Sequence, residues 1–569
     1  MYISKVKIDS YRGFEKFQTD LSKLTVIIGE NGSGKSNFFS ALTLPLSGNQ
    51  IHFTQKRLNV SDINIASIKK FYTAIIEKKS DQKIFDLVPK VSIEVTFTSP
   101  EGEYEEAILM NWLSANPNGQ EYKIRYEFFA SKIEDLVESV KHLLKDVTSI
   151  EEVHWFTFPV EFYEHRIVSC NNLRQISYND LKPIVMNYIN ADRDDFSDSA
   201  SMQSNSLLTR MLESSLKDEE KVKINKSYNE FFKSIEDTDT FKSIIELSPG
   251  FENFADHIDR IKCIPNLPNM RNILSNITLK SEDEFFHQKG LGERNLLYII
   301  LLFEFYKNRK DCFNLCCIEE PEAHLGVNNL RLSVDFISKS TEQGSSLIQT
   351  LVSTHNPAVL NKLKLSNVVV FSGDEAIPIG DADDYLTNYL RKRPNFDILK
   401  LLFADRVILV EGPTEEMLIN SFYSKDVGKL SNVEIISVGQ KGFKKFLDIW
   451  LRINKDNFNK KIGIVRDFDD EQNAKDEHDK YDKENENICV RTTENYSLED
   501  DLVKTDKNIE SLKSIFELES SADVNDVIEH MKNDKADSML ELCSYLLNEK
   551  EGCSVDLPKH IKQVVEFVA

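Results

Sequence analysis

Several stretches of hydrophobic and polar side chains in the first 130 residues are typical of β-strands. Residues 91–97, VSIEVTF, alternate at every second position, and residues 2–8 and 122–128 carry apolar anchors with a similar spacing. Residues 24–28 form a continuous apolar, β-branched run, which is typical of a strand buried on both faces. The pattern therefore predicts a meander of strands in this part of the chain.

From residue 131 the apolar positions recur with helical spacing. One face of a helix over residues 131–147 would carry Ile133, Leu136, Val137, Val140, Leu143 and Leu144. Further helical pattern runs through residues 206–247, so we expect a mainly helical insertion over residues 131–285. Its apolar faces could make a local core, a dimer contact or a coiled arm, and these three alternatives stay open.

Alternating strands and helices return after residue 285. A long apolar helix is expected at residues 296–306, followed by strands at 313–318 and 349–353. The fold class is therefore α/β, with a break at the polar, proline-marked segment 391–394.

A second α/β unit is predicted over residues 401–510. Its strands are expected at residues 406–410, 433–438 and 461–465. Residues 470–487 are dense in Asp, Glu and Lys and are predicted to form a solvated loop. The last part, residues 511–569, is expected to be a C-terminal region of short helices.

Composition narrows the class of protein. A length of 569 residues calls for several domains, and no apolar run approaches the length of a membrane span. No signal-peptide core and no CxxC pair occur, which predicts a cytoplasmic protein with reduced thiols. The net charge of −23 argues against a chain that coats nucleic acid along its whole surface. It is compatible with a nuclease, because metal-binding carboxylates add negative charge and a local basic groove can hold a phosphate backbone.

A glycine-rich motif follows the apolar run at residues 24–28. The sequence GENGSGKS fits G-x-x-x-x-G-K-[ST], with a strand before it and a helical pattern after it. Its glycines let backbone N–H groups point at phosphate oxygens, Lys35 can reach the β- and γ-phosphates, and the Ser36 hydroxyl can ligate Mg²⁺. The residues expected to bind ATP here are Gly29, Asn31, Gly32, Gly34, Lys35, Ser36 and Asn37.

Two later strands end in residues suited to the same site. Glu319 and Glu320 follow the strand at residues 313–318, where acids can hold Mg²⁺ and orient a water for attack on a γ-phosphate. His355 follows the strand at residues 349–353 and can contact the γ-phosphate.

The order of these motifs resembles the ATPase heads of the ABC class shared by SMC, Rad50 and RecF proteins, and most closely the OLD (overcoming lysogenization defect) family. The strings in that order are YRGF, GENGSGKSN, KGLGERN, CCIEEPEAHL and STHNP. The resemblance implies one ABC-type ATPase domain built from residues 1–130 and 286–400. It further implies Glu319 as the Mg²⁺-directing acid, Glu320 as the catalytic base and His355 as the switch histidine.

The signature-like segment departs from the transporters of this class. Gly290 and Gly292 lie at a helix start that suits an anion, and the resemblance implies that they bind nucleotide. The LSGGQ motif of the transporter signature is missing, which disfavours a transport function. Arg193 looks like the arginine that the family carries before the signature.

Acids gather after the strands of the second unit. Glu411 and Glu415 follow the first strand in EGPTE, and Asp467 and Asp469 follow the third in DFD. This order resembles a Toprim domain in the form seen in OLD nucleases, and the resemblance implies that these four acids hold divalent metal, with Glu411 and Asp467 as catalytic residues. Two metals held by shared carboxylates can activate water against a phosphodiester.

A further acid usually completes this set of metal ligands, and the sequence leaves Glu494 and Glu499 as two candidates for it. Lys559 or Lys562 could place a cation by the scissile phosphate, although a solvated helix face is the simpler interpretation of either lysine.

The expected function is that of an ATP-binding endonuclease that uses Mg²⁺, or Mn²⁺ at the Toprim site, and cleaves nucleic acid, with double-stranded DNA as the expected substrate. The layout is similar to the nuclease subunits of Gabija anti-phage systems, which implies a UvrD-like helicase partner. In the ABC class, an ATP site closes when the signature of one head meets ATP bound to another head, so that two chains share the site. Because this chain carries one phosphate loop and one signature, the resemblance implies a homodimer or a higher even oligomer. No membrane association is expected. The alternatives are an SMC- or RecF-like DNA clamp without nuclease activity, a Toprim topoisomerase or primase, or an effector that cuts RNA or tRNA. The missing tyrosine-bearing cleavage domain argues against the topoisomerase.

Overall fold

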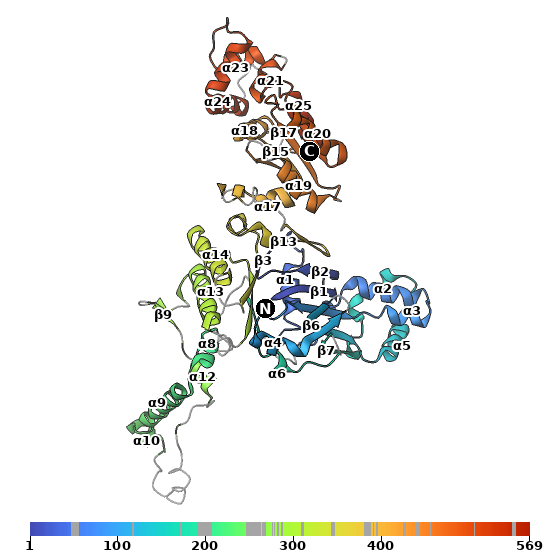
Figure 1. Cartoon of the computed structure of the whole chain (residues 1–569), viewed down its shortest axis with the longest axis vertical. Helices are drawn as coiled ribbons and strands as arrows, with labels where there is room; N and C mark the ends of the chain where they lie inside the picture. The colour runs from blue at the N-terminus through green and yellow to red at the C-terminus, as the bar shows by residue number, and fades with distance from the viewer. Residues whose placement is uncertain are drawn as a thin grey trace, which may run out of the picture. The chain divides into compact units, whose positions relative to one another are not determined.

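The computed structural model describes residues 1–46, 56–116, 119–170, 173–189, 207–245, 263, 269–275, 277, 279–281, 284–285, 288–308, 312–342, 348–379, 388–390, 392–393, 396–424, 428–439, 443–455, 457–505, 507–548 and 554–569. They form two compact units, Met1–Thr25 with Ser36–Thr354, and Val26–Lys35 with His355–Ala569 (Figure 1). Arg193 and part of the break at 391–394 lie outside the described residues.

An antiparallel sheet forms one part of the first unit. Its strands are β1 (Ile3–Tyr11), β2 (Phe14–Asp20), β4 (Val91–Phe97), β5 (Leu113–Asn116), β6 (Gly119–Ala130) and β7 (Tyr163–Ser169). The strand order is β2-β1-β4-β6-β5, with β7 also paired to β6. The strands expected at residues 2–8, 91–97 and 122–128 lie in this sheet, whereas the strand expected at residues 24–28 belongs to another sheet.

Helices cover one region beside this sheet. They are α2 (Ile65–Ile76), α3 (Asp81–Asp86) and α5 (Ile133–Leu143), grouped at the right of Figure 1. The face predicted for the helix after residue 131 is confirmed in its centre, where Leu136, Val137 and Val140 are buried, while Ile133 and Leu143 are exposed.

Parallel strands form a second sheet region of this unit. β11 (Phe313–Glu319) pairs with both β12 (Ile348–Ser353) and β8 (Ile184–Ile189). Every residue of β11 and β12 is buried, as the continuous apolar runs predict. Helices α13 (Leu291–Asn308) and α14 (Val327–Glu342) pack against each other beside these strands.

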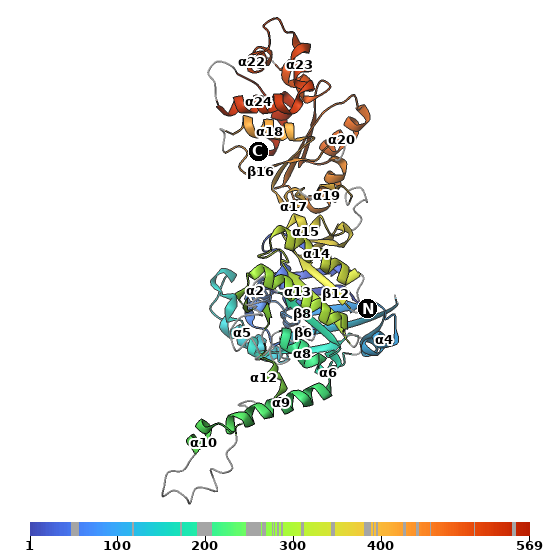
Figure 2. The ribbon, with the colours of Figure 1, turned by 90° about the vertical axis from the view of Figure 1, so that its left-hand side faces the viewer.

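The prediction of a mainly helical insertion over residues 131–285 is wrong at residues 163–169 and 184–189, which are strands. β7 and β8 lie in that range and belong to the two sheets, because their short runs pair with strands that are distant in sequence. Besides α5, the described helices of this range include α8 (Leu207–Ser215), α9 (Asp218–Glu236) and α10 (Asp239–Ile245). No residue of α9 is buried, and both views show it extending away from the sheets of this unit (Figures 1 and 2).

The second unit contains residues 26–29 of the strand that precedes the phosphate loop. β3 (Leu24–Gly29) pairs in parallel with β13 (Val368–Ser372), which pairs antiparallel with β14 (Glu375–Pro378). The short helices α15 (Pro357–Leu360) and α17 (Ile398–Phe403) lie in the same unit.

A four-stranded parallel sheet follows, in the order β16-β15-β17-β18. The strands are β15 (Arg406–Val410), β16 (Val433–Ser437), β17 (Lys461–Arg466) and β18 (Ile488–Thr492). The helices around it are α18 (Pro413–Phe422), α19 (Phe443–Asn454), α20 (Gln472–Glu484), α21 (Leu498–Lys504), α22 (Asn508–Ile515), α23 (Val524–Asn533), α24 (Lys535–Asn548) and α25 (Lys559–Val568).

Two predictions for this part need correction. The solvated loop expected at residues 470–487 is the polar helix α20, in which His478 is the buried residue, because its Gln, Ala, Lys and Glu residues favour helix without an apolar face. The C-terminal helices do not form a region of their own. They share one hydrophobic core with β15 and β17, since α25 packs directly on those strands. In the part of the chain that the structure describes, no helix has the length and hydropathy needed to cross a membrane.

Candidate active sites

The phosphate loop adopts a conformation that depends on its glycines. Gly32 and Gly34 have φ values of +82° and +96°, a region that L side chains rarely adopt. At Gly29 a Cβ atom would lie 2.4 Å from the Ser33 Oγ atom and 2.6 Å from the Phe371 carbonyl oxygen. The loop therefore requires glycine at all three positions.

The side chains of the loop reach its own backbone. Lys35, the first residue of α1 (Lys35–Leu42), donates from Nζ to the carbonyl oxygens of Gly29 and Glu30, each at 2.9 Å. Asn31 and Ser36 are exposed to solvent, so the amide and the hydroxyl are accessible to a ligand. The loop thus presents a lysine, a hydroxyl and a helix N-terminus together, which is the arrangement that binds phosphate.

Asn37 is held by the YRGF segment. Its Oδ1 atom accepts a 3.3 Å hydrogen bond from Arg12 Nη1, and Arg12 also pairs with Asp62 at 2.9 Å. Arg12 has a φ of +47° in the turn between β1 and β2. The sequence singled out YRGF without a role, and the structure places its arginine against the first turn of α1.

The acids after β11 belong to the first unit. Glu319 is 9% exposed and hydrogen-bonded to Tyr188, whose pKa is raised by burial and by the Glu319 charge. Glu320 has a φ of +42° and donates its N–H to the Ser353 carbonyl oxygen at 2.9 Å. The two neighbouring acids therefore differ in environment, with Glu319 buried and Glu320 half-buried at a strained turn.

Gly292 has a structural role in this chain. A Cβ atom there would lie 2.2 Å from the His324 carbonyl oxygen, and Asn295 donates from Nδ2 to the Ala323 carbonyl oxygen at 3.2 Å. The KGLGERN segment thus packs on the EEPEAHL loop. Gly290 is exposed, and a Cβ atom there would meet open space. Nucleotide contact by these two glycines stays a prediction.

His355 lies two residues after the end of β12 with its side chain exposed. The next residue, Asn356, caps α15 by accepting a 2.8 Å hydrogen bond from the Ala358 N–H. The histidine is thus fixed between a buried strand and a capped helix, and its accessible imidazole is compatible with the predicted contact to a phosphate.

The acids of the second unit line one cleft of about 740 Å³. Its walls come from the carboxyl ends of β15 and β17 and from the first turns of α18, α21 and α24. The predicted metal ligands in this lining are Glu411, Glu415, Asp467, Asp469 and Glu499. They meet because parallel strands end at the same edge of the sheet.

Asp467 lies at the centre of the charge cluster. Glu411 accepts the Asp467 N–H at 3.0 Å, which ties the end of β15 to the end of β17. Burial, together with the negative charges of Glu411, Glu415 and Glu499, raises the pKa of Asp467 to about 8. Burial also raises the pKa values of Glu411 and Glu415. The carboxylates therefore destabilise one another in the absence of a cation.

The remaining acids are held by the backbone. Glu415 accepts the Gly412 N–H at 2.9 Å at the start of α18. Asp469, at a φ of +50°, donates its own N–H to the Tyr496 carbonyl oxygen at 3.0 Å. Asp470 is exposed and does not line the cleft. A left-handed turn at residues 469–470, and not a continued strand, separates these two side chains.

The structure distinguishes between the two candidates for the completing acid. Glu499 is 2% exposed, accepts a 2.7 Å hydrogen bond from Ser497 Oγ and lines the cleft. The side chain of Glu494 is 72% exposed, lies 4.0 Å from Lys559 and is not part of the cleft lining, so its role as a metal ligand stays a prediction. Asp501 accepts the Glu494 N–H and turns this loop away from the acids.

The lysines of the cleft, Lys532 and Lys535, are not the ones that the sequence indicated. Lys559 and Lys562 lie outside the cleft lining, and Lys562 pairs with Asp556 at 3.3 Å. Lys535, at the start of α24, lies 2.9 Å from Glu499 Oε1. Burial lowers the pKa of Lys535, but Glu499, Glu415 and Asp467 raise it to a net value above the usual range. No sequence pattern marks this lysine, because α24 is distant from the strands along the chain.

The donor set is compatible with hard divalent cations. Carboxylate oxygens are the ligands that Mg²⁺ and Mn²⁺ prefer, and the mutual repulsion around Asp467 would be relieved by a bound cation. Among the described residues, no three His, Cys, Asp or Glu side chains converge in the geometry of an assembled metal site. The fit therefore rests on the chemistry and charge of the cleft.

Comparison with known proteins matches two domain families along the chain. The family described as AAA ATPase domain matches residues 1–360, and the family described as overcoming lysogenization defect protein-like, TOPRIM domain, matches residues 402–469. The chain is 22% identical over 524 residues to "Endonuclease GajA" from Bacillus cereus strain HuB5-5, covering 76% of this chain and 72% of that protein. It is 27% identical over 150 residues to "Endonuclease GajA" from strain VD045, covering 26% of this chain and 25% of that protein.

Among solved structures, the SMC head domain from Thermotoga maritima aligns with 66% of this chain and 97% of its own length. The identity is 13% and the TM-score is 0.28, which is too low to support a conclusion about this chain. The chain belongs to the AAA ATPase domain family and carries an OLD-like Toprim domain after its ATPase region.

Proposed function

We propose that this protein is an ATP-binding, divalent-metal-dependent endonuclease that cleaves nucleic acid at the Toprim cleft. The observation that carries the proposal is the convergence of five carboxylates and Lys535 in one cleft at the ends of β15 and β17. Two relatives that bear the name "Endonuclease GajA" support it.

In the proposed reaction the acids of the cleft hold the cations and Lys535 faces the phosphate. Glu411, Asp467 and Glu499 come from three different elements, so they can surround a site that is open to solvent on one side. Divalent cations, when bound, lower the pKa of a water and neutralise charge on the departing oxygen. The Lys535 ammonium, already close to Glu499, would bind a non-bridging phosphate oxygen and lower the cost of its developing charge.

The second proposed activity is ATP hydrolysis. We assign phosphate binding to Lys35 with the loop glycines, and a Mg²⁺ ligand to the Ser36 hydroxyl. Glu319 would direct the cation and Glu320 would orient the attacking water. His355 would contact the γ-phosphate, as its exposed position after β12 allows.

The partners follow from the same reasoning. We propose double-stranded DNA as the substrate in anti-phage defence, with a UvrD-like helicase as partner. We also propose a homodimer or a higher even oligomer, with the exposed aromatic face of α9 as part of the interface, since Phe231 is 55% exposed there. A cytoplasmic location would suit this role.

The test is a plasmid-cleavage assay with Mg²⁺ or Mn²⁺, with and without ATP, run beside an ATPase assay. Asp467→Ala should abolish cleavage and leave ATP hydrolysis within a few-fold of normal. Asp470→Ala is the matched control and should cleave normally, because Asp470 is exposed outside the cleft. Undiminished cleavage by Asp467→Ala would reject the Toprim site as the nuclease. A wild-type protein that hydrolyses ATP and binds DNA without cutting it would favour the alternative of a DNA clamp.

A further inference from the structure

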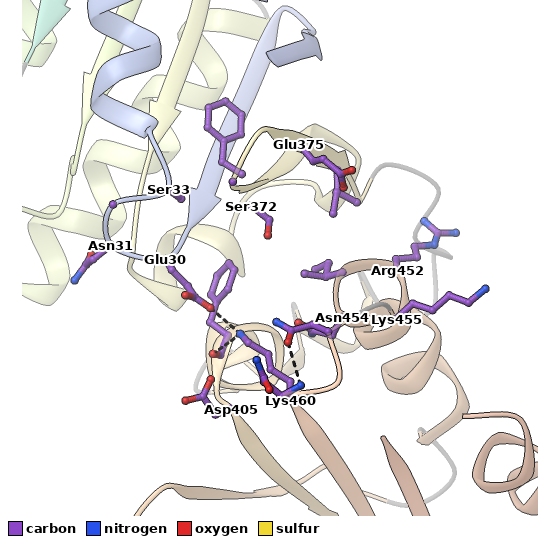
Figure 3. A pocket seen from close by; sticks show the side chains of 18 residues that line it. Glu30, Asn31, Ser33, Ser372, Glu375, Asp405, Arg452, Asn454, Lys455 and Lys460 are labelled. Carbon is purple, nitrogen blue, oxygen red and sulfur yellow. Dashed lines mark hydrogen bonds and ion pairs between the residues drawn. The ribbon is translucent and has the colours of Figure 1, made fainter. Parts of the chain in front are cut away.

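A hollow of about 580 Å³ lies between the phosphate loop and the base of the Toprim sheet, within the second compact unit. Figure 3 shows Glu30 and Asn31 on one side and Asn454, Lys455 and Lys460 on the other. The two sides are joined by an ion pair in which Lys460 Nζ lies 2.7 Å from Glu30 Oε1.

Lys460 is an unusual lysine because it is almost fully buried. Its side chain is 8% exposed, and Nζ also donates to the Phe403 carbonyl oxygen at 2.8 Å. Burying an ammonium is costly unless it is paired, so the position of Lys460 depends on these two acceptors. One acceptor is a backbone carbonyl of the Toprim side, and the other is a side chain of the phosphate loop.

Lys460 also marks the start of the strand that carries the central acid. β17 begins at the next residue, and Asp467 follows its last residue. Five of its six residues are buried, and it pairs with β15 on one side and β18 on the other. At about 3.3 Å per residue, the strand is a rigid rod of about 20 Å with the phosphate loop at one end and the acid cleft at the other.

The loop has a means to respond to nucleotide. Lys35 Nζ donates to the carbonyl oxygens of Gly29 and Glu30, the residue whose side chain holds Lys460. Phosphate oxygens are stronger acceptors for an ammonium than peptide carbonyls. Nucleotide binding would therefore draw Lys35 from the Glu30 carbonyl oxygen and place negative charge beside the Glu30 carboxylate, which changes its hold on Lys460.

We propose that the Glu30–Lys460 ion pair couples nucleotide binding at the phosphate loop to the position of Asp467, with Lys460 as a positioning residue of the acid cleft. This inference rests on the proposed function, since it assumes that the loop binds nucleotide and that the cleft cleaves nucleic acid. The chain of contacts is Lys35, Glu30, Lys460 and β17, and every member belongs to the same compact unit.

The test compares the full-length wild-type protein with Lys460→Met, Lys460→Arg and Lys455→Met. Lys455 is the matched control, because it is an exposed lysine that lines the same hollow. Two readouts are taken with and without a non-hydrolysable ATP analogue. They are hydrogen–deuterium exchange of the β17 amides and the rate of plasmid cleavage.

In the wild-type protein the analogue should change both readouts by about five-fold or more, the lower range of allosteric couplings. In Lys460→Met the change in both readouts should fall to below two-fold, while the affinity for the analogue stays within about three-fold of wild type, below that coupling range. Lys460→Arg keeps the cation and should retain the response, and Lys455→Met should behave as wild type. If Lys460→Met does not fold, Glu30→Gln removes the same ion pair from the loop side, with its analogue affinity measured alongside.

A full nucleotide response in Lys460→Met would overturn the proposal. So would a wild-type protein that binds the analogue without any change in β17 exchange. If no sample cleaves nucleic acid, the proposed function fails, but the exchange measurement still decides the coupling.

Discussion

The most informative substitution is Lys535→Met, because Lys535 is the cleft lysine that pairs with the predicted metal ligand Glu499, and sequence patterns did not indicate it. Its Nζ atom lies 2.9 Å from Glu499 Oε1, and its charge also acts on Glu415 and Asp467. Methionine keeps the length of the side chain and removes the charge. Glu499 stays in place in the variant, since Ser497 Oγ donates to its other oxygen at 2.7 Å.

The expected loss follows from the charge that develops on the phosphate. Removing one preorganised donor from a transition state costs about 10²–10³-fold in kcat, or about 2.7–4 kcal/mol. The Lys535 side chain is 45% exposed, so solvent screening places the expected loss near the lower limit, at about 100-fold. The Mg²⁺ concentration for half-maximal rate should stay constant or fall, because a positive charge that repels the cation has been removed.

The assay is single-turnover cleavage of plasmid DNA across a Mg²⁺ titration, which separates the rate constant from metal affinity. Lys532→Met is the matched control. Lys532 also lines the cleft but pairs with Asp500 at 2.7 Å and is 38% exposed, so only a small change of a few-fold is expected. A rate constant for Lys535→Met near that of the wild type would refute the role of this lysine. A normal rate that merely requires more Mg²⁺ would assign it to holding Glu499.

Three further predictions concern the rest of the chain. Glu320→Gln should bind ATP and hydrolyse it slowly, because the shape is kept and the base is lost, and a slow Glu319→Gln beside a normal Glu320→Gln would reverse the two roles. Gly463→Ala should lower the stability by about 1–3 kcal/mol in denaturant unfolding, because the new Cβ atom would lie 2.4 Å from a Val564 methyl, whereas Gly428→Ala, in open space, should be neutral. Light scattering should give an even oligomer with or without ATP, and a monomer under both conditions would contradict the shared ATP site.

Local sequence patterns predicted most of the secondary structure and the location of both sites. Strands such as β4 and β15 begin and end where their alternating or continuous apolar runs do, because burial of one or both faces sets those periods. The polar helix α20 was not predicted, since a helix with hardly any buried face shows no period of apolar residues in the sequence.

The sequence by itself determined which chemistry is present. A glycine-rich loop after a buried strand, and acids after parallel strands, predict a phosphate site and a carboxylate cleft, because the residues that follow such strands come to one edge of a sheet. Tertiary structure decided which of the remaining charges join them. It brought Glu499 and Lys535 into the cleft, left Glu494 outside, and set Lys460 against Glu30, 430 residues away. Such choices depend on how the C-terminal helices wrap around the sheet, and the packing of side chains that are distant along the chain leaves no periodic signal in the sequence.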